Sequence, residues 1–179
     1  MLDVIGTVVR LGLAAVWLIS GAIKAADPNQ TYAAVKAYQV LPAGLVSPVA
    51  GALPFVELAF GLLVLIGIGQ RLMGVLSAVL LLVYIAGVAQ SWARGLTIDC
   101  GCFGGGGQVA AGQTQYPQEI LRDTGFLLLA VWLVVRPRSL FSMDGLLRRG
   151  RQDGQDELDE LDDADEHGNG PATSAVGRA

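Results

Sequence analysis

Long apolar stretches separated by short polar breaks dominate the chain. A transmembrane helix needs about 20 mostly apolar residues, and stretches of roughly that length lie at residues 4–26, 44–69, 72–93 and 120–135. The pattern therefore predicts an all-α integral membrane protein, a bundle of four transmembrane helices. The first stretch is unlike a cleaved signal peptide, because Met1-Leu2-Asp3 carries no basic residue and no small-residue cleavage site follows.

The break after the first stretch predicts a short helix at the membrane surface. Asp27 and Pro28 end the first apolar run, since proline interrupts a continuing helix. Tyr32, Val35 and Tyr38 then recur at a helical spacing within a more polar segment. Such an amphipathic segment is typical of a helix that lies in the plane of the interface.

The other two breaks differ in length. Residues 67–71 form a very short turn, so we expect the second and third spans to be antiparallel neighbours. Residues 94–118 are polar and rich in glycine, and they contain both cysteines of the chain. The run from Gly104 to Gly107 differs from a phosphate-binding loop, because no strand precedes it and no Gly-Lys-Ser follows it. We interpret it as a flexible loop.

Composition supports a membrane protein and separates the tail from the rest. The 179 residues are 53% hydrophobic and 16% charged, which is too apolar for a soluble domain of this size. Residues 144–179 hold four Arg against ten Asp and Glu, a net charge of −6, which leaves +2 for residues 1–143. We therefore predict a four-helix membrane domain over residues 1–143 and an acidic, disordered cytoplasmic tail over residues 144–179. The acidity belongs to the tail, so no nucleic-acid-binding surface is expected.

The Lys and Arg residues near the span ends set the expected orientation, because cytoplasmic loops carry an excess of them. One side has Arg71, Arg136, Arg138, Arg148, Arg149 and Arg151, and the other has Lys24, Lys36, Arg94 and Arg122. We expect a multi-pass protein of the plasma membrane with both termini in the cytoplasm. The cysteine-bearing loop then lies outside the cell, on the oxidising face where a disulfide persists.

The motif Cys100-Gly101-Cys102 is the main candidate for chemistry. Two cysteines and one histidine are too few for an iron–sulfur cluster or a structural zinc site within one chain, so no metal is expected. Gly101 allows the sharp turn that a disulfide between residues two apart requires. Strained disulfides are the more oxidising and labile ones, which favours electron exchange over a structural role. Two alternatives stay open: small residues in a tight turn, or a metal shared across a dimer.

Charged residues within the apolar stretches are the second candidate set. Arg10, Trp17 and Lys24 are spaced by seven residues and share one face of the first helix, and Glu57 falls near the middle of the second. Charges at membrane depth usually mark function or a buried partner. Glu57 could relay protons or order a quinone head group, with Arg10 or Lys24 as its partner. The alternative is an ion pair that only stabilises the fold.

Arg122 begins the fourth apolar stretch, close to the point where the cysteine-bearing loop re-enters the membrane. A nearby cation lowers the pKa of a thiol and favours its reactive thiolate. Arg122 or Lys24 could therefore activate one of the cysteines. The alternative is that Arg122 only extends its head group to the interface.

Several motifs occur in a fixed order along the chain: Arg10, Trp17, Gly21, Lys24, Tyr38-x-Val40-Leu41-Pro42, Pro54-x-x-Glu57-x-x-x-Gly61, Ile98-Asp99-Cys100-Gly101-Cys102-Phe103-Gly104 and Arg122-Asp123. In this order the chain resembles the MauE family of redox-associated membrane proteins, which is related to DoxX. The resemblance covers roughly residues 4–137, and the Cys-Gly-Cys-Phe-Gly segment is its most specific portion. It implies a four-helix membrane bundle. It also implies a role of the methylamine-utilisation type, in maturing the disulfide-rich small subunit of methylamine dehydrogenase.

The chain departs from this pattern in ways that bear on function. The four-glycine run and the acidic tail lie outside it, and Asp123 stands where many relatives are expected to have Asn. Because many relatives occur without the methylamine pathway, the resemblance implies thiol–disulfide chemistry more firmly than it implies methylamine. The DsbB and VKOR enzymes use two cysteine pairs, whereas this chain has one, so it cannot pass electrons between pairs of its own.

These observations predict a membrane thiol–disulfide redox component and possible thiol–disulfide oxidoreductase. Its Cys100/Cys102 pair would exchange electrons with a thioredoxin-like or disulfide-forming protein on the outer face. A reduced partner would attack the disulfide, a mixed disulfide would form, and the second cysteine would resolve it. We expect Cys100 to carry the mixed disulfide. The electrons would then pass to a membrane quinone or to another protein.

Two other functions remain open at this point. The bundle could be a non-catalytic scaffold or assembly subunit in which the cysteines form a static clasp. Small-molecule transport through a polar path at Arg10 and Glu57 is a weaker alternative, because four short helices show no internal repeat.

Overall fold

The computed structural model of the protein describes residues 2–101, 105–110 and 112–136, and most of them are helical. The elements are α1 (Leu2–Ala26), α2 (Pro28–Ala37), α3 (Ala43–Ile66), α4 (Gln70–Ala93), β1 (Ile98–Asp99), β2 (Gly107–Gln108) and α5 (Tyr116–Val135). The acidic tail predicted over residues 144–179 and the second cysteine, Cys102, lie outside the described residues.

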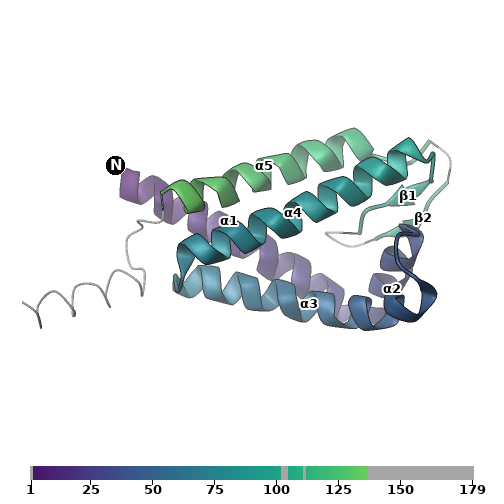
Figure 1. Ribbon diagram of the computed structural model, residues 1–179, viewed down its shortest axis with the longest axis horizontal. Coiled ribbons are helices and arrows are strands. Elements are labelled where there is room, and N and C mark those ends of the chain that lie inside the picture. Colours follow the sequence, from purple (N-terminus) through teal and green to yellow (C-terminus); the bar gives the residue numbers. More distant parts are fainter. Residues whose placement is uncertain (1, 102–104, 111, 137–179) are drawn as a thin grey trace, which may run out of the picture.

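Within the described ranges, α1 from Val4 onward, α3 and α4 are long and apolar enough to cross a membrane. This gives three candidate spans where the sequence predicts four. The fourth predicted span corresponds to α5, whose 20 residues include Glu119, Arg122 and Asp123 in the first two turns. These three charges make α5 more polar than the other long helices. It nevertheless packs along α4 and contacts α1 (Figure 1).

Close approach of small residues joins α1 to α3. A Cβ atom on Gly61 would lie 2.6 Å from the side chain of Leu18, so no larger residue fits at that crossing. Small residues at helix crossings are the usual way in which membrane helices pack tightly, because lipid supplies no hydrophobic drive between helices. Gly21 has the same role on α1, where it lies against the backbone of Pro54 and Leu58.

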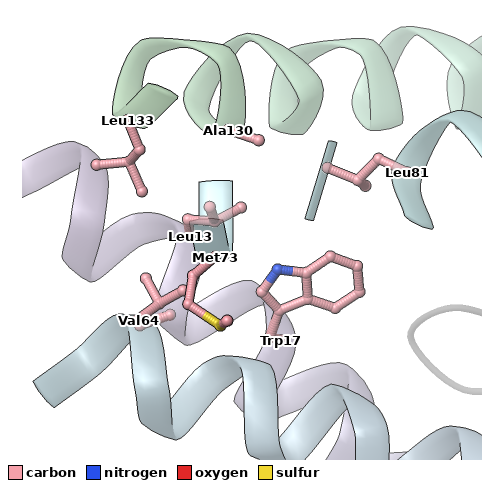
Figure 2. Close-up of a cluster of buried hydrophobic side chains, with 8 residues drawn as sticks. Leu13, Trp17, Val64, Met73, Leu81, Ala130 and Leu133 are labelled. Atoms are coloured by element: carbon pink, nitrogen blue, oxygen red, sulfur yellow. The ribbon is translucent and has the colours of Figure 1, made fainter. Parts of the chain in front are cut away.

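The interior of the helices is apolar around Trp17. A cluster of buried side chains from α1, α3, α4 and α5 meets there, comprising Leu13, Ala14, Trp17, Val64, Met73, Leu81, Ala130 and Leu133 (Figure 2). The indole nitrogen of Trp17 donates a hydrogen bond to Ser77 Oγ at 3.0 Å, which satisfies its one polar atom in this setting. Phe60 stacks edge-on against the same ring, with centroids 5.9 Å apart.

The two central helices α3 and α4 are joined by the short turn at Gly67 and Gly69, as the sequence suggests. Their main contacts are elsewhere, however, because α3 packs chiefly against α1 and α4 against α5. The two helices therefore diverge from the turn. At their far end α2 and the two short strands fill the space between them (Figure 1).

The described residues of the cysteine-bearing segment include a short strand pair that the sequence analysis did not predict. Strands β1 and β2 pair antiparallel, with Ile98 opposite Gln108 and Asp99 opposite Gly107. The positive φ angles of Gly105 (73°), Gly106 (96°) and Gly107 (103°) let the chain turn back to form this pair. These three glycines thus allow the chain to return to α2, which β2 contacts.

Candidate functional site

Cys100 follows β1 directly and is fixed from three sides. Its side chain is 7% exposed. Its Sγ accepts a hydrogen bond from Arg122 Nη2 at 3.3 Å, its backbone N–H donates to Glu119 Oε1 at 3.2 Å, and its carbonyl accepts from Tyr38 OH at 3.2 Å. Helix α5 supplies two of these partners and α2 ends at the third. The redox candidate is therefore held between two helices that are distant in sequence.

The backbone conformation at Gly101 and its closeness to α2 explain why glycine follows Cys100. Its φ of 70° lies in the left-handed region, and a Cβ atom there would stand 3.0 Å from Ala34 Cβ on α2. Both the turn and the close approach to α2 therefore require glycine. Gly101 has the positive φ that a sharp turn after Cys100 requires, and Cys102 lies outside the described residues.

Arg122 lies between a carboxylate and the sulfur. Its Nε donates to Asp123 Oδ1 at 3.1 Å, and its Nη2 reaches Cys100 Sγ. Asp123 is buried, so it orients the guanidinium from the protein interior. Arg122 thus does more than extend to the interface, which was the simpler alternative. A fixed cation at this distance favours the thiolate form of a cysteine.

Glu119 is a site residue that the sequence reasoning missed. It occupies the first turn of α5, three residues before Arg122, and its side chain is 6% exposed. Its Oε2 has no hydrogen-bond partner among the residues that the structure describes. Burial, and then the nearby Cys100 sulfur, raise the pKa of Glu119 to about 7. The sequence feature that could have identified Glu119 is its spacing of three residues from Arg122, which places both side chains on one face of α5.

One possible metal site overlaps this cluster. Asp99, Cys100 and Glu119 each offer one ligand atom, and these atoms lie within 4.8 Å of one another. A thiolate with two carboxylates is a donor set that a divalent cation such as Zn²⁺ accepts. The guanidinium of Arg122 stands 3.3 Å from the same sulfur and would repel such a cation. The geometry therefore fits a thiolate stabilised by arginine better than a metal thiolate.

Lys24 and Glu57 form a buried ion pair deeper in the helices. Lys24 Nζ lies 2.8 Å from Glu57 Oε1 and 2.9 Å from Oε2, and Glu57 is 0% exposed. Ser20 Oγ accepts from Lys24 at 2.6 Å and donates to Glu57 at 3.0 Å, while Tyr84 OH donates to the same carboxylate. Of the two cations proposed as partners of Glu57, Lys24 is the one that the structure places beside it.

Arg10 lies far from this pair. At 1.5 Å per residue, it stands about 21 Å from Lys24 along α1. It is buried in the N-terminal half of the helix, whereas Lys24 lies in its last turn. The structure therefore brings together Lys24, Glu57 and Tyr84, and separately Cys100, Glu119 and Arg122, but it does not bring Arg10 to either group.

Two cavities of different character flank the cysteine. The larger, of about 630 Å³, is mostly apolar and is bordered by Lys24, Tyr38, Tyr84 and Cys100 among residues of α1 to α4. The smaller, of about 370 Å³, is polar and is lined by Asp99, Gln113, Gln115, Gln118, Glu119 and Arg122. The partners of Cys100 thus face a polar space on one side, and Cys100 itself borders an apolar one on the other.

Comparison with known proteins gives one match. The model of a family described as methylamine utilisation protein MauE matches residues 2–136, which include every helix and strand described above. No curated protein and no solved structure matches the chain.

Proposed function

The chain belongs to the MauE family, and from this membership and the surroundings of Cys100 we propose that it is a membrane thiol–disulfide exchange component. Its Cys100/Cys102 pair would oxidise a thioredoxin-like or disulfide-forming protein, in a maturation role of the methylamine-utilisation type. The observation that carries the proposal is the contact between Arg122 Nη2 and Cys100 Sγ at 3.3 Å. A static structural cysteine has no need of a cation that favours its thiolate.

The burial of Cys100 favours a division of labour opposite to the one expected from the sequence. An incoming protein thiolate needs an accessible sulfur, whereas the leaving sulfur needs a stabilised negative charge. Cys100 is buried beside Arg122, so it suits the leaving role. We therefore assign the mixed disulfide to Cys102 and the released thiolate to Cys100.

The exchange then runs in two balanced steps. A thiolate of the reduced partner attacks Cys102 Sγ, the Cys100–Cys102 bond breaks, and Cys100 leaves as a thiolate beside Arg122. A second thiol of the partner attacks the mixed disulfide and releases Cys102. The partner loses two electrons and two protons and becomes a disulfide, and the Cys100/Cys102 pair is left as a dithiol.

The proposed membrane arrangement makes α5 the fourth span, with residues 120–135 in the bilayer and Glu119 at its outer end. The support is that α5 packs along α4, which is itself long and apolar enough to span. Both termini would lie in the cytoplasm, and α2 would lie at the outer interface of the plasma membrane. The Cys100/Cys102 pair then meets its partner in an oxidising compartment.

A measurement of reduction potential separates this proposal from its rival, a non-catalytic scaffold with a static cysteine clasp. The purified full chain is equilibrated with mixtures of reduced and oxidised glutathione, and its thiols are counted by mass after alkylation. A working pair should be reduced within the range of the glutathione couple. A clasp should stay oxidised, with a potential below about −300 mV, and that result would favour the scaffold.

A further inference from the structure

We propose that the apolar cavity beside Cys100 binds a membrane quinone, which takes the electrons that the Cys100/Cys102 pair acquires from its partner. The inference rests on the proposed function, because it names the acceptor that such a pair needs. It differs from the sequence-based expectation of a quinone at Arg10 and Glu57, since Arg10 is remote from this cavity.

The cavity lies where α3 and α4 diverge, with α2 closing one end. Its volume of about 630 Å³ is within the usual range for pockets that hold ring-shaped organic ligands. Its walls are apolar side chains of several helices, including Ile23 of α1, Leu53 of α3, and Leu80 and Val83 of α4. Such walls fit a substituted ring with an attached hydrocarbon chain better than they fit a charged or peptide ligand.

A minority of the residues that line the cavity are polar, among them Lys24, Tyr38 and Tyr84. Tyr38 and Tyr84 both border the cavity and pack against the cluster of buried residues that contains Cys100. Lys24 Nζ stands 5.7 Å from the centre of the Tyr84 ring and is held by Glu57. A quinone carbonyl oxygen is a hydrogen-bond acceptor, and Tyr38 OH, which donates to the Cys100 carbonyl, could donate to it instead. This hydroxyl would direct the head group of the quinone toward Cys100.

The chemistry of the pair specifies the kind of acceptor. Oxidation of Cys100 and Cys102 breaks two S–H bonds, forms one S–S bond, and releases two electrons and two protons. A quinone takes up both electrons and both protons and becomes a hydroquinone, so the step balances without another reactant. Quinones also reside in the bilayer. An acceptor of that kind fits this cavity, because α1, α3 and α4, which are apolar enough to span the bilayer, supply part of its walls.

Several apolar side chains that line the cavity are also exposed. Val40, Val49 and Val83 line the cavity and are also exposed on the surface of the helices. These residues lie in the linker before α3, in α3 and in α4, where the last two helices diverge. A quinone could therefore enter sideways from the bilayer. The partner protein would approach from the polar cavity at Glu119 and Arg122, so the two reactants need not compete for space.

The first test measures binding without turnover. The full chain carrying Cys100→Ala and Cys102→Ala is placed in phosphatidylcholine nanodiscs and titrated with a photoreactive analogue of decylubiquinone. Saturable labelling of peptides from α3, α4 or the linker that holds Val40 is expected, and unlabelled decylubiquinone should suppress it. Equal suppression by decanol, which has the chain but no ring, would show that the cavity only accepts lipid chains and would overturn the proposal. Absence of saturable labelling would overturn it too.

Cavity-filling variants provide the specificity control. Leu53→Trp and Val83→Trp place an indole in the cavity from two different helices, and each should weaken decylubiquinone binding by on the order of ten-fold or more. Phe55→Trp is the matched control on α3, because Phe55 is 69% exposed and does not line the cavity. It should bind as the unchanged chain does. Unaltered binding in both filling variants would contradict the proposed location. Two variants on different helices are used so that poor folding of one still leaves the other as a test.

Electron transfer is then followed in the chain with both cysteines. The reduced protein is mixed with decylubiquinone without oxygen, and the loss of two thiols per chain should match the hydroquinone formed. If neither quinone reduction nor photolabelling is observed, but a mixed disulfide to a partner protein is still trapped, the quinone proposal alone is rejected. Quinone labelling and reduction without any trapped partner would instead reject the proposed exchange with a protein.

Discussion

Arg122 reaches back from the second turn of α5 to place its guanidinium 3.3 Å from the sulfur of Cys100, which follows β1 in a different segment of the chain. Asp123 fixes the same guanidinium at 3.1 Å. This arrangement gives one cysteine of the pair a fixed positive neighbour, and it makes the reactivity of that cysteine dependent on α5.

Removing the cation should slow the reaction of Cys100 with thiol reagents. In a chain carrying Cys102→Ala, Arg122→Met should lower the rate of alkylation by N-ethylmaleimide at pH 7 by on the order of ten-fold, because less thiolate is present. Arg122→Lys should restore some of the rate. Arg94→Met serves as the control, since Arg94 contacts Gln39 and Gln90 on the exposed surface. Equal rates in Arg122→Met and Arg94→Met would rule out this role for Arg122.

Glu119 should give the same reaction a distinct pH dependence. Its pKa is raised to about 7, so the carboxyl is neutral below that pH and carries a charge that opposes the thiolate above it. Glu119→Gln keeps an acceptor for the Cys100 N–H and removes this charge. With Cys102→Ala, the variant should react several-fold faster at pH 8 and nearly equally at pH 6. A rate ratio that does not change with pH would refute the assignment.

The same shift has a consequence for stability. The carboxyl ionises near pH 4.5 in an unfolded chain and near 7 in the folded one, so the folded state binds more protons between these values. Stability should therefore fall as pH rises from about 4.5 to 7, and Glu119→Gln should lack this portion of the decline. Thermal unfolding of both proteins across that range would measure the difference.

The ion pair of Lys24 and Glu57 should be needed for the fold. Glu57→Gln leaves the buried ammonium of Lys24 without its carboxylate, which typically destabilises a protein by about 3–5 kcal/mol. The combined change Glu57→Gln with Lys24→Met removes both charges and should recover some of that loss. Thermal unfolding in detergent measures both. If Glu57→Gln alone leaves stability and redox turnover unchanged, the pair has neither a structural nor a proton-transfer role.

Hydrophobic patterning predicts most of the helices because each helix depends on local sequence. The bounds of α1, α3 and α4 differ from the predicted stretches by only a few residues at each end. The motif at Cys100 and the cation at Arg122 could also be found, since both are unusual residues at the ends of apolar runs. The charges of Glu119, Arg122 and Asp123 explain why α5 is less apolar than the other long helices.

The site itself depends on contacts between distant segments, which one sequence does not reveal. Arg10 and Lys24 share a helix face, and only the packing of α1 on α3 shows that Glu57 meets Lys24. Glu119 looks like an ordinary acidic residue in a first helical turn until β1 is placed against it. The cavity arises because α3 and α4 diverge, and no periodicity in either helix predicts that angle.

The proposed orientation can be tested with single cysteines in a chain that carries Cys100→Ala and Cys102→Ala. Gln113→Cys adds an exposed thiol near the cysteine-bearing segment, and Arg71→Cys adds one at the start of α4, by the α3–α4 turn. In intact cells a membrane-impermeant maleimide should label the first and not the second. The reverse pattern would place Cys100 on the cytoplasmic side and remove the argument from an oxidising compartment.

The most direct test of thiol–disulfide exchange is the capture of a partner through one cysteine. The full chain with Cys100→Ala, with Cys102→Ala, and with both changes is expressed in the cells that make it, and membranes are separated on non-reducing gels. We predict a band of higher mass, sensitive to reductant, for Cys100→Ala, with an extracytoplasmic protein of thioredoxin-like or disulfide-forming type attached through Cys102. Absence of any trapped protein in the two single variants, together with normal function of the double variant, would contradict the exchange reaction and leave the scaffold.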